Sequence, residues 1–394
     1  MSIFHLLAAE AAVRGAGLKF RALDRKDRGT STSSGSMRIA HWQETVRLVH
    51  EHAERTLREA PAVATQANVQ AIVADQLDVA AGTVAELLAI PHITVCCAPP
   101  TVLDGSVPPP YFSWAHQDTL FARLRSRMAS TWIHLALAPV LKTINRYRDQ
   151  WGLPRVHTAG QLCSKLAMIT QLPGVLEFPG ARASGVMYTG PFRDDRAASK
   201  PSFPWQRLDR RPLIYASMGT VRNKDPRARR VIAEACADLG HQLVVSLGGG
   251  STLPEDIDGL PGSPIVVDDA PQSALLQRSA LMINSAGLSS SLEAIRHGVP
   301  IVAIPVAEDQ PGVAARLRRA GVALTIPRRR LSVPRLTAAV VELITNPTYH
   351  EALRRCRDAV ARRNGVEEAV NIIDRCLATR ARTHNFVTAA RISA

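Results

Sequence analysis

The chain has 394 residues, 46% of them apolar, which is enough for two packed hydrophobic cores and makes two domains the first expectation. Its net charge of +14 suggests a nucleic-acid partner, but the basic residues are spread along the sequence without interleaved aromatic residues, which favours a bias in composition and no nucleic-acid partner. The six cysteines form no C-x-x-C pair, and no apolar run reaches the ~20 residues of a membrane span, so we expect a cytoplasmic protein without a metal site.

Short β-like runs alternate with helical stretches along most of the chain, which is the pattern of parallel sheets covered by helices. In the first half, strands are expected at residues 3–7, 18–22, 70–74 and 92–96, and helices at residues 41–58 and 79–88. The proline-rich segment 99–110 interrupts this alternation, and a long amphipathic stretch follows it at 119–151. An insertion after a strand end is where an open α/β sheet places a region that shapes a ligand site.

The second half repeats the alternation after a polar, proline-punctuated linker at residues 193–211. Strands are expected at 213–217, 242–247, 265–267, 281–284 and 301–304, and helices at 227–239, 288–296, 312–320 and 334–345. The sequence thus predicts an N-terminal domain at residues 1–192, a C-terminal domain at 212–378 with its last helix close to the junction, and a disordered tail at 379–394.

The densest polar signal lies between Asp269 and Gln310. A strand ends in the small-residue turn from Ser285 to Gly287, and Ser289 and Ser290 fall in the first turn of the following helix. A helix N-terminus with free N–H groups and a positive dipole end suits an anion such as a diphosphate. The alternative is ordinary N-capping of the helix by serine.

Three further side chains extend this signal. Glu293 lies one turn beyond Ser290 and could accept the two hydroxyls of a ribose, although a solvated surface carboxylate is the alternative. Asp309 and Gln310 follow the next strand at the carboxyl edge of the sheet, where they suit the hydroxyls of a sugar. For Asp309 the alternative is an N-cap.

Several segments resemble the donor-site signature of the family 1 UDP-glycosyltransferases, and most closely the bacterial zeaxanthin glucosyltransferase-like and macrolide-glycosyltransferase-like members. The segments are APQ followed by LL, then AGLSSSLEA, GVPIVAIP and EDQPGVAAR. Outside them, YASMGT at 215–220 resembles the first strand and phosphate-side loop of the family's C-terminal domain, and YTGPF at 188–192 resembles the segment before the linker. The likeness covers roughly residues 2–378.

The resemblance implies a GT-B fold, in which two Rossmann-like, doubly wound parallel-sheet domains face a cleft. The N-terminal domain would hold the acceptor and the C-terminal domain a UDP-sugar, a co-substrate that needs neither a metal nor a cofactor. Carried over by position, Gln272 would contact the nucleoside, Glu293 the ribose, and Ser289 and Ser290 the phosphates. Asp309 and Gln310 would contact the sugar. The residues that would border the phosphates are Gly219, Thr220, Ser285 and Gly287.

The sequence departs from the family pattern at three donor-site positions. Asp269 stands where an aromatic residue usually stacks on uracil, Ser285 where a histidine contacts the diphosphate, and Ser289 where asparagine is common. Loss of base stacking costs on the order of 1–3 kcal/mol in comparable contacts, so a weaker donor affinity or a looser base preference is expected.

The larger departure lies at the start of the sequence. Family members open with a strand, a glycine-histidine loop that carries the catalytic base, and a helix, whereas residues 1–7 here already resemble the second strand. Asp75 matches the aspartate that orients this histidine, so it is a weaker base or a relic, or it caps the following helix. His5, His92 and His297 are expected to have structural roles.

The leading hypothesis is transfer of a hexose from a UDP-sugar to a hydroxyl of a lipophilic acceptor, carotenoid- or polyketide-like, with inversion and without a metal. Such an acceptor also implies peripheral contact with a membrane. The rival is a non-catalytic relative that binds a nucleotide-sugar or a protein partner. A nicotinamide oxidoreductase is disfavoured, because no G-x-G-x-x-G follows the first strand. A start codon upstream of Met1 would also explain the missing ~30–35 residues, the length of one strand, loop and helix.

Overall fold

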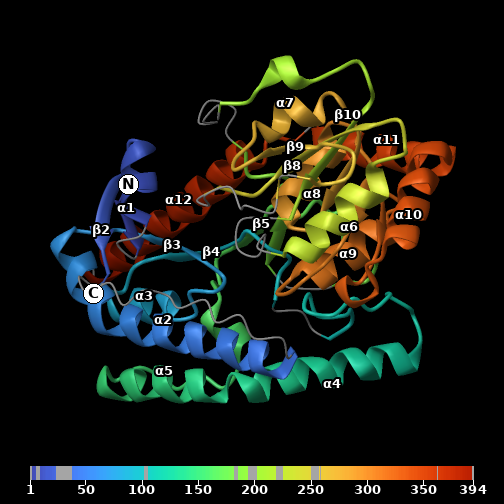
Figure 1. Cartoon of the computed structure of the whole chain (residues 1–394). Helices are drawn as coiled ribbons and strands as arrows, with labels where there is room; N and C mark the ends of the chain where they lie inside the picture. Colours follow the sequence, from blue (N-terminus) through green and yellow to red (C-terminus); the bar gives the residue numbers. More distant parts are fainter. Residues whose placement is uncertain are drawn as a thin grey trace.

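The computed structural model describes residues 2–5, 9–23, 38–101, 105–181, 185–193, 202–218, 225–249, 257, 259–361 and 363–392. Figure 1 shows a larger body formed by the second half of the chain and a smaller one formed by the first half. In both bodies strands alternate with helices, and every hydrogen-bonded strand pair is parallel. The α/β class predicted from the sequence is therefore confirmed.

The second half contains one six-stranded sheet. Its strands are β7 (Leu213–Ser217), β8 (Gln242–Ser246), β9 (Ile265–Val267), β10 (Ser279–Asn284), β11 (Ile301–Ala303) and β12 (Ala323–Thr325). They lie in the order β12-β11-β10-β7-β8-β9, the 3-2-1-4-5-6 order of a Rossmann sheet read backwards. The strand order reverses between β7 and β10, and ligands of such sheets bind outside the carboxyl ends of the strands at this point.

Helices cover both faces of this sheet because successive strand residues point to opposite sides. Tyr215 of β7 belongs to one core cluster and its neighbour Ile214 to the other. The first cluster includes side chains of α8 (Leu288–Arg296), α9 (Gln310–Arg319) and α11 (Pro347–Ala361), and the second includes those of α6 (Pro226–Cys236) and α10 (Val333–Thr345). The short helix α7 (Gln272–Leu276) precedes β10 and contributes to the first cluster.

The first half contains two separate sheets. Strands β3 (Ile72–Asp75), β4 (His92–Cys96), β5 (Met168–Thr170) and β6 (Val186–Tyr188) form one, and β1 (Ser2–His5) with β2 (Lys19–Ala22) forms the other. In the usual Rossmann order, β1 and β2 take the second and third places and β3 the fourth. No strand of the described chain occupies the first place, which falls between β1 and β3.

The helices of the first half are α1 (Glu10–Gly15), α2 (Arg38–Gln66), α3 (Ala81–Leu87), α4 (Leu120–Ala136) and α5 (Ala138–Gln150). The amphipathic stretch predicted at 119–151 thus forms two helices, α4 and α5. They are separated at Leu137, because Pro139 lacks the backbone N–H that a continuous helix needs and is accommodated in the first turn of α5.

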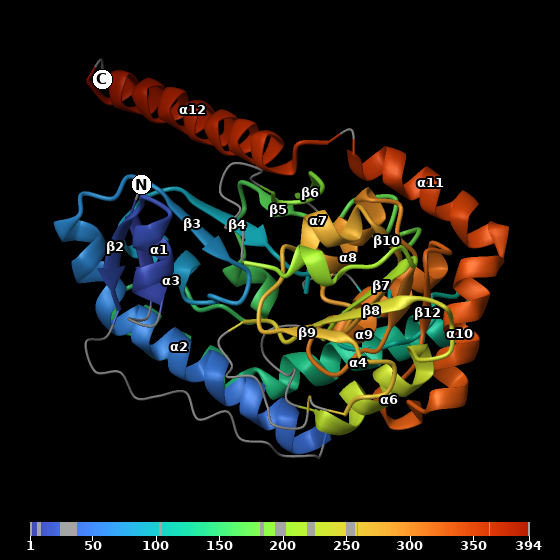
Figure 2. The ribbon, with the colours of Figure 1, turned by 45° about the horizontal axis from the view of Figure 1, so that its top comes forward.

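The last helix, α12 (Gly365–Ile392), returns to the first half of the chain (Figure 2). Its Ala369 and Ile372 pack against Ile93 of β4 and Ile169 of β5. The structure continues this helix through residue 392, where the sequence analysis predicts a disordered tail from residue 379. No glycine or proline follows Gly365 up to residue 392, so nothing in that stretch of sequence stops the helix.

The two halves are joined by buried contacts around α9. Arg316 of α9, which is 1% exposed, forms an ion pair of 2.8 Å with Glu177 from the first half. At the start of the same helix, the Gly312 N–H donates to the Pro110 carbonyl over 2.9 Å. A Cβ at Gly312 would lie 2.2 Å from that carbonyl oxygen, so only glycine allows this close approach. The proline-rich segment is thereby held against the N-terminus of α9.

Candidate functional site

The turn between β10 and α8 is held by one buried side chain. Asn284, at the end of β10, accepts a hydrogen bond from the Ala286 N–H (2.9 Å) and donates one to the Ser291 hydroxyl (3.1 Å). Ala286 has φ 63°, in the left-handed region that non-glycine residues rarely adopt. Buried Ser285 lies in this turn. Gly287 is the N-cap of α8 and, because it has no side chain, makes no capping hydrogen bond to the helix.

Neither Ser289 nor Ser290 caps α8, so the alternative of serine N-capping is wrong here. The Ser290 hydroxyl donates to the Gly287 carbonyl over 3.1 Å, and the exposed Ser289 hydroxyl accepts from the Gln171 side chain over 3.1 Å. The N-terminus of α8 therefore lacks a side-chain cap and lies beside the strand-order switch point of the sheet. Its N–H groups and dipole suit an anion.

Glu293 is held in place by basic side chains and is not a solvated surface carboxylate, because only 16% of its side chain is exposed. Its Oε1 lies 3.3 Å from His297 Nε2 and 3.4 Å from an Arg193 nitrogen. Burial by itself would raise the pKa of Glu293, but hydrogen bonds from His297 and Ser273 and the charge of Arg193 outweigh it and lower the pKa. The carboxylate is thus charged and oriented one turn along α8.

Asp309 and Gln310 begin α9. Asp309 is the N-cap by position, yet its side chain makes no capping hydrogen bond. Burial raises the pKa of Asp309 to about 6; a backbone hydrogen bond opposes this shift, and the neighbouring Glu308 adds to it. The Gln310 Oε1 accepts from the Val306 (2.9 Å) and Ala307 (3.2 Å) N–H groups, which leaves its amide hydrogens to act as donors.

Gln272, Gly219 and Thr220 are the remaining residues predicted to bind the donor. Gln272 is the first residue of α7 and is half-buried, and the next residue, Ser273, bonds to His297 over 2.9 Å and so links α7 to the Glu293 cluster. Asp269 accepts from the Ala270 N–H over 2.8 Å. Gly219 and Thr220 lie outside the described residues.

A cavity of about 440 Å³ lies in the first half between α2, α4 and the loop after β3. Aromatic side chains form part of its lining: Trp42 packs edge-on against Tyr111, with ring centroids 5.2 Å apart. Polar residues also line it, among them Asp75, Gln76 and Asp78 and several threonine, serine and histidine side chains. An apolar, aromatic cavity with a few polar groups suits a lipophilic alcohol.

Asp75 stands at the carboxyl end of β3 with its carboxylate exposed towards this cavity. It accepts the Leu77 N–H over 2.9 Å, and it does not cap α3, whose N-cap is Ala80. Burial raises the pKa of the nearby Cys97 to about 11, and the Asp75 carboxylate contributes to the shift.

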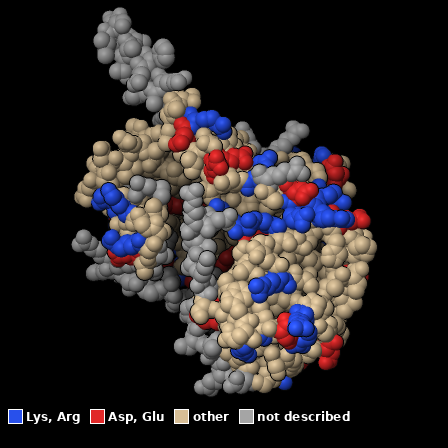
Figure 3. Space-filling view, turned by 90° about the horizontal axis from the view of Figure 1, so that it is seen from above, with Lys and Arg blue, Asp and Glu red and all other residues tan. Residues whose placement is uncertain are grey.

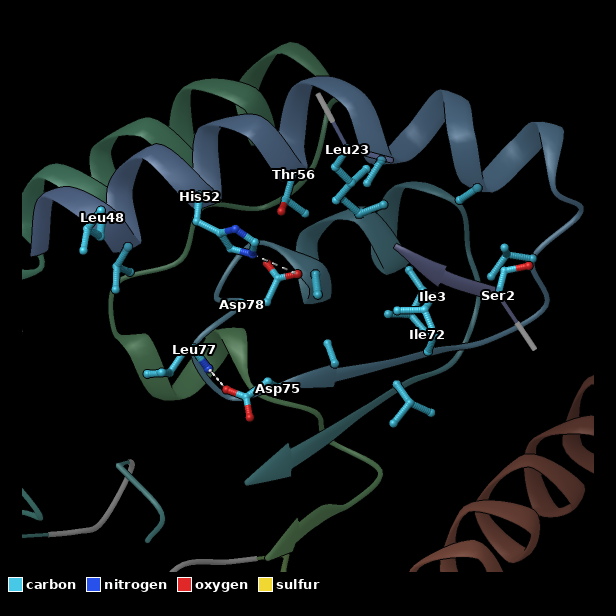
Figure 4. Close-up of a pocket in the computed structure, with 18 residues that line it drawn as sticks. Ser2, Ile3, Leu23, Leu48, His52, Thr56, Ile72, Asp75, Leu77 and Asp78 are labelled. Atoms are coloured by element: carbon cyan, nitrogen blue, oxygen red, sulfur yellow. Dashed lines mark hydrogen bonds and ion pairs between the residues drawn. The ribbon is translucent and has the colours of Figure 1, made fainter. Parts of the chain in front are cut away.

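A second cavity, of about 500 Å³, also borders Asp75 and lies between β1 and β3 (Figure 4). Ile3 of β1 and Ile72 of β3 face it, and α2 covers it. The cavity thus occupies the place in the sheet that no described strand fills. His52 of α2 points to Asp78, with 3.7 Å between Nε2 and the carboxylate.

Three residues of the site are not found by reading the sequence. Gln171 donates to Ser289 and to the Cys97 carbonyl, and so ties the first half to the start of α8. Arg193 reaches Glu293 from the linker, and His52 pairs with Asp78 across the fold. Each contact joins residues far apart in the sequence, and no local pattern indicates it.

The surface shows no single basic face in the view from above. Figure 3 shows a furrow between two lobes, with Lys and Arg patches on both and acidic patches among them. Within the described residues, no cluster of three or more His, Cys, Asp or Glu side chains is placed to hold a metal ion. None of the described helices is both long and apolar enough to cross a membrane.

Comparisons with known proteins show which family the chain resembles. The profile of the family described as UDP-glucoronosyl and UDP-glucosyl transferase matches residues 164–358, about half of the chain. The zeaxanthin glucosyltransferase of Pantoea ananas is 28% identical over 340 residues, which cover 85% of this chain and 78% of that protein.

Two solved structures show the same fold. The glycotransferase of kitacinnamycin has a TM-score of 0.72 at 21% identity and covers 95% of this chain and 91% of its own. Glycosyltransferase VinC, solved in complex with DTDP, has a TM-score of 0.66 at 18% identity, with coverage of 96% and 92%. The chain therefore belongs to the UDP-glucoronosyl and UDP-glucosyl transferase family and is a glycosyltransferase of the GT-B fold.

Proposed function

We propose that the protein transfers a hexose from a UDP-sugar to a hydroxyl of a lipophilic acceptor, with inversion at the anomeric carbon and without a metal. The observation that carries this proposal is the N-terminus of α8, which has no side-chain cap and lies at the strand-order switch point, with the oriented Glu293 one turn further along. The diphosphate would bind the helix N-terminus, and Glu293 would accept the ribose hydroxyls.

The chemistry needs a stabilised leaving group and a base. The N–H groups and dipole of α8 would stabilise the negative charge that develops on the departing diphosphate. Within the described residues, two groups at the acceptor cavity could serve only as a weaker base than the family's histidine: Asp75, and Asp78 with its partner His52. Attack of the acceptor oxygen on the anomeric carbon, opposite to the diphosphate, inverts that carbon and passes the hydroxyl proton to the base.

The acceptor follows from the lining of the first cavity. Its aromatic side chains and mostly apolar lining surface favour a large apolar alcohol, and a zeaxanthin glucosyltransferase is among the relatives. Such acceptors dissolve in membranes, so the proposal includes peripheral membrane contact. All six cysteines are unpaired, which supports a reducing compartment such as the cytosol.

Donor binding tests the assigned roles of Glu293 and Gln310. Glu293→Ala should weaken UDP binding by about 10- to 100-fold, since hydrogen bonds to a charged group contribute about 1.5–3 kcal/mol. Gln310→Ala should weaken UDP-glucose more than UDP, because only the conjugate carries the sugar. Calorimetry with both ligands measures this, and Glu351→Ala, an exposed glutamate on α11, is the matched control. Equal losses for both ligands in both variants would contradict the assignments.

The affinity for the sugar should depend on pH through Asp309. Because the pKa of Asp309 is raised to about 6, its carboxyl is neutral below this pH and accepts sugar hydroxyls more weakly. UDP-glucose binding, measured relative to UDP, should strengthen as pH rises through about 6, and Asp309→Asn should flatten that rise. A carboxyl group whose folded pKa is raised stabilises the folded state only while it stays protonated, so this contribution should be lost between about pH 4 and pH 6, and thermal unfolding should show stability falling over that range.

The alternative is a protein that binds nucleotide-sugar without turnover. Asp269 and Ser285 favour it, because they stand where the family has a stacking aromatic residue and a histidine that contacts the diphosphate. Normal UDP-glucose binding combined with no transfer by any form of the chain would support this alternative.

A further inference from the structure

One side of α4 exposes a row of large apolar side chains. Apart from the adjacent pair at the start, they are spaced three or four residues apart along one face of the helix, and each is half exposed or more: Leu120, Phe121, Leu124, Met128, Trp132 and Leu135. Leu120 is 85% and Phe121 is 74% exposed. With its 17 residues the helix is about 25 Å long, so the row extends over the width of a small domain.

This face lies on the outside of the protein. In Figure 1, α4 and α5 run along the lower edge as its outermost elements. Beside α4, an open hollow of about 590 Å³ is bordered by Phe112 and Trp114, whose rings stack with centroids 4.2 Å apart. Arg125 lies over the Trp114 ring at 4.4 Å. The exposed apolar surface therefore continues from the helix onto the preceding loop.

The charge of the helix is of one sign. α4 contains three arginines and no acidic residue, and Arg123 and Arg127 flank the apolar row with exposed side chains. Asp118, which precedes the helix, is paired with Arg123 at 2.5 Å. An apolar stripe with tryptophan, flanked by arginines, is the composition of helices that lie in the interface of an anionic bilayer. The helix does not cross the membrane.

We propose that the exposed face of α4 is a docking surface for an anionic lipid bilayer. The opposite side of the same helix, at Ser130, Ile133 and His134, lines the acceptor cavity, and Trp132 packs on Trp42 of that cavity with centroids 5.3 Å apart. Docking therefore places the cavity next to the lipid. The proposal rests on the proposed function only for the lipophilic acceptor, which could then pass from the bilayer to the cavity without crossing water.

Vesicle binding of the full chain, without donor or acceptor, tests this surface. The wild-type chain should sediment with vesicles of phosphatidylcholine mixed with phosphatidylglycerol and much less with pure phosphatidylcholine. Phe121→Glu with Met128→Glu should lower the partition coefficient by at least about tenfold, because two apolar side chains no longer enter the lipid. Arg123→Gln with Arg127→Gln should weaken binding to the anionic vesicles and reduce its salt dependence.

The matched control places two glutamates on exposed apolar positions far from α4. Val341 of α10 and Val370 of α12 are 43% and 49% exposed, so Val341→Glu with Val370→Glu changes the net charge equally. This control should bind vesicles as the wild type does, and thermal unfolding should show that all variants fold.

Two results would overturn the proposal. One is failure of the wild type to bind anionic vesicles, or equal binding by the α4 variant and the control. The other is a dimer of the wild type, detected by light scattering, that does not bind vesicles and that Phe121→Glu with Met128→Glu dissociates. The exposed face of α4 would then join two copies of the chain. Neither result bears on sugar transfer, which is measured with a water-soluble alcohol.

Discussion

A chain extended at its N-terminus by one strand, its loop and a helix should transfer sugar about 10²–10⁴ times faster than the 394-residue chain, the range that a positioned general base contributes. The cavity between β1 and β3 is the reason. Each of the two strands borders the cavity with one edge that is not hydrogen-bonded to any described strand. Apolar side chains from α2 and α3 complete the lining. An inserted parallel strand would pair with both edges at once.

The same cavity explains why the effect should reach catalysis. Val73 of β3 is 50% and Leu77 is 52% exposed, so the strand that carries Asp75 is an uncovered edge. A strand beside β3 would fix Asp75, and its following loop would enter the space next to Asp75 and the His52–Asp78 pair.

The extension can be taken from the start of the zeaxanthin glucosyltransferase of Pantoea ananas. Transfer from UDP-glucose is compared between the extended chain, the 394-residue chain and an extension whose strand carries two prolines, which cannot donate to the ladder. The proline extension should restore little activity. Equal rates for the original and extended chains would mean that the base lies within residues 1–394, and Asp75→Asn and His52→Gln would then identify it.

Arg316→Met should destabilise the protein by about 3–5 kcal/mol, the cost of leaving a buried charge without its partner. Arg316 is 1% and Glu177 is 7% exposed, and the Arg316 guanidinium also lies 4.5 Å from the centre of the Phe178 ring. The variant leaves the Glu177 carboxylate buried between the two halves, where water does not solvate it.

A double variant separates the charge from the packing. Arg316→Met with Glu177→Leu removes both charges, so urea unfolding should show a much smaller loss than Arg316→Met alone. Arg230→Met, which breaks the exposed Arg230–Glu234 pair on α6, is the control and should cost less than about 1 kcal/mol. Equal losses for Arg316→Met and the double variant would show that the ion pair does not join the halves as described.

The strands that carry the donor site could be predicted from the sequence because their signals are local. The apolar runs at β7, β8 and β10 are bounded by turn residues, and the small-residue turn from Ser285 to Gly287 marks the start of α8. The strands β5, β6 and β12, with three residues each, are not predicted from the sequence, although β9 and β11, which are equally short, are predicted. Three residues are too few to give a periodic pattern, so the prediction of such strands depends on the residues around them.

The rest of the site depends on contacts between distant residues. The Glu293 cluster needs Arg193 from the linker, and the start of α8 needs Gln171 from the first half. The packing of α12 on β4 and β5 also follows from tertiary structure, because a helix pattern predicts an apolar face but not its partner.

Formation of a glycoside by the extended chain decides whether the protein transfers a sugar with inversion. The extended chain is incubated with UDP-glucose and a hydroxylated carotenoid, and the product is examined by mass spectrometry and by the NMR coupling of its anomeric proton. We expect an acceptor that carries one hexosyl unit with inverted configuration, release of UDP, and loss of both in Glu293→Ala at low donor concentration. UDP-glucose binding with no glycoside, or a glycoside with retained configuration, would contradict this expectation.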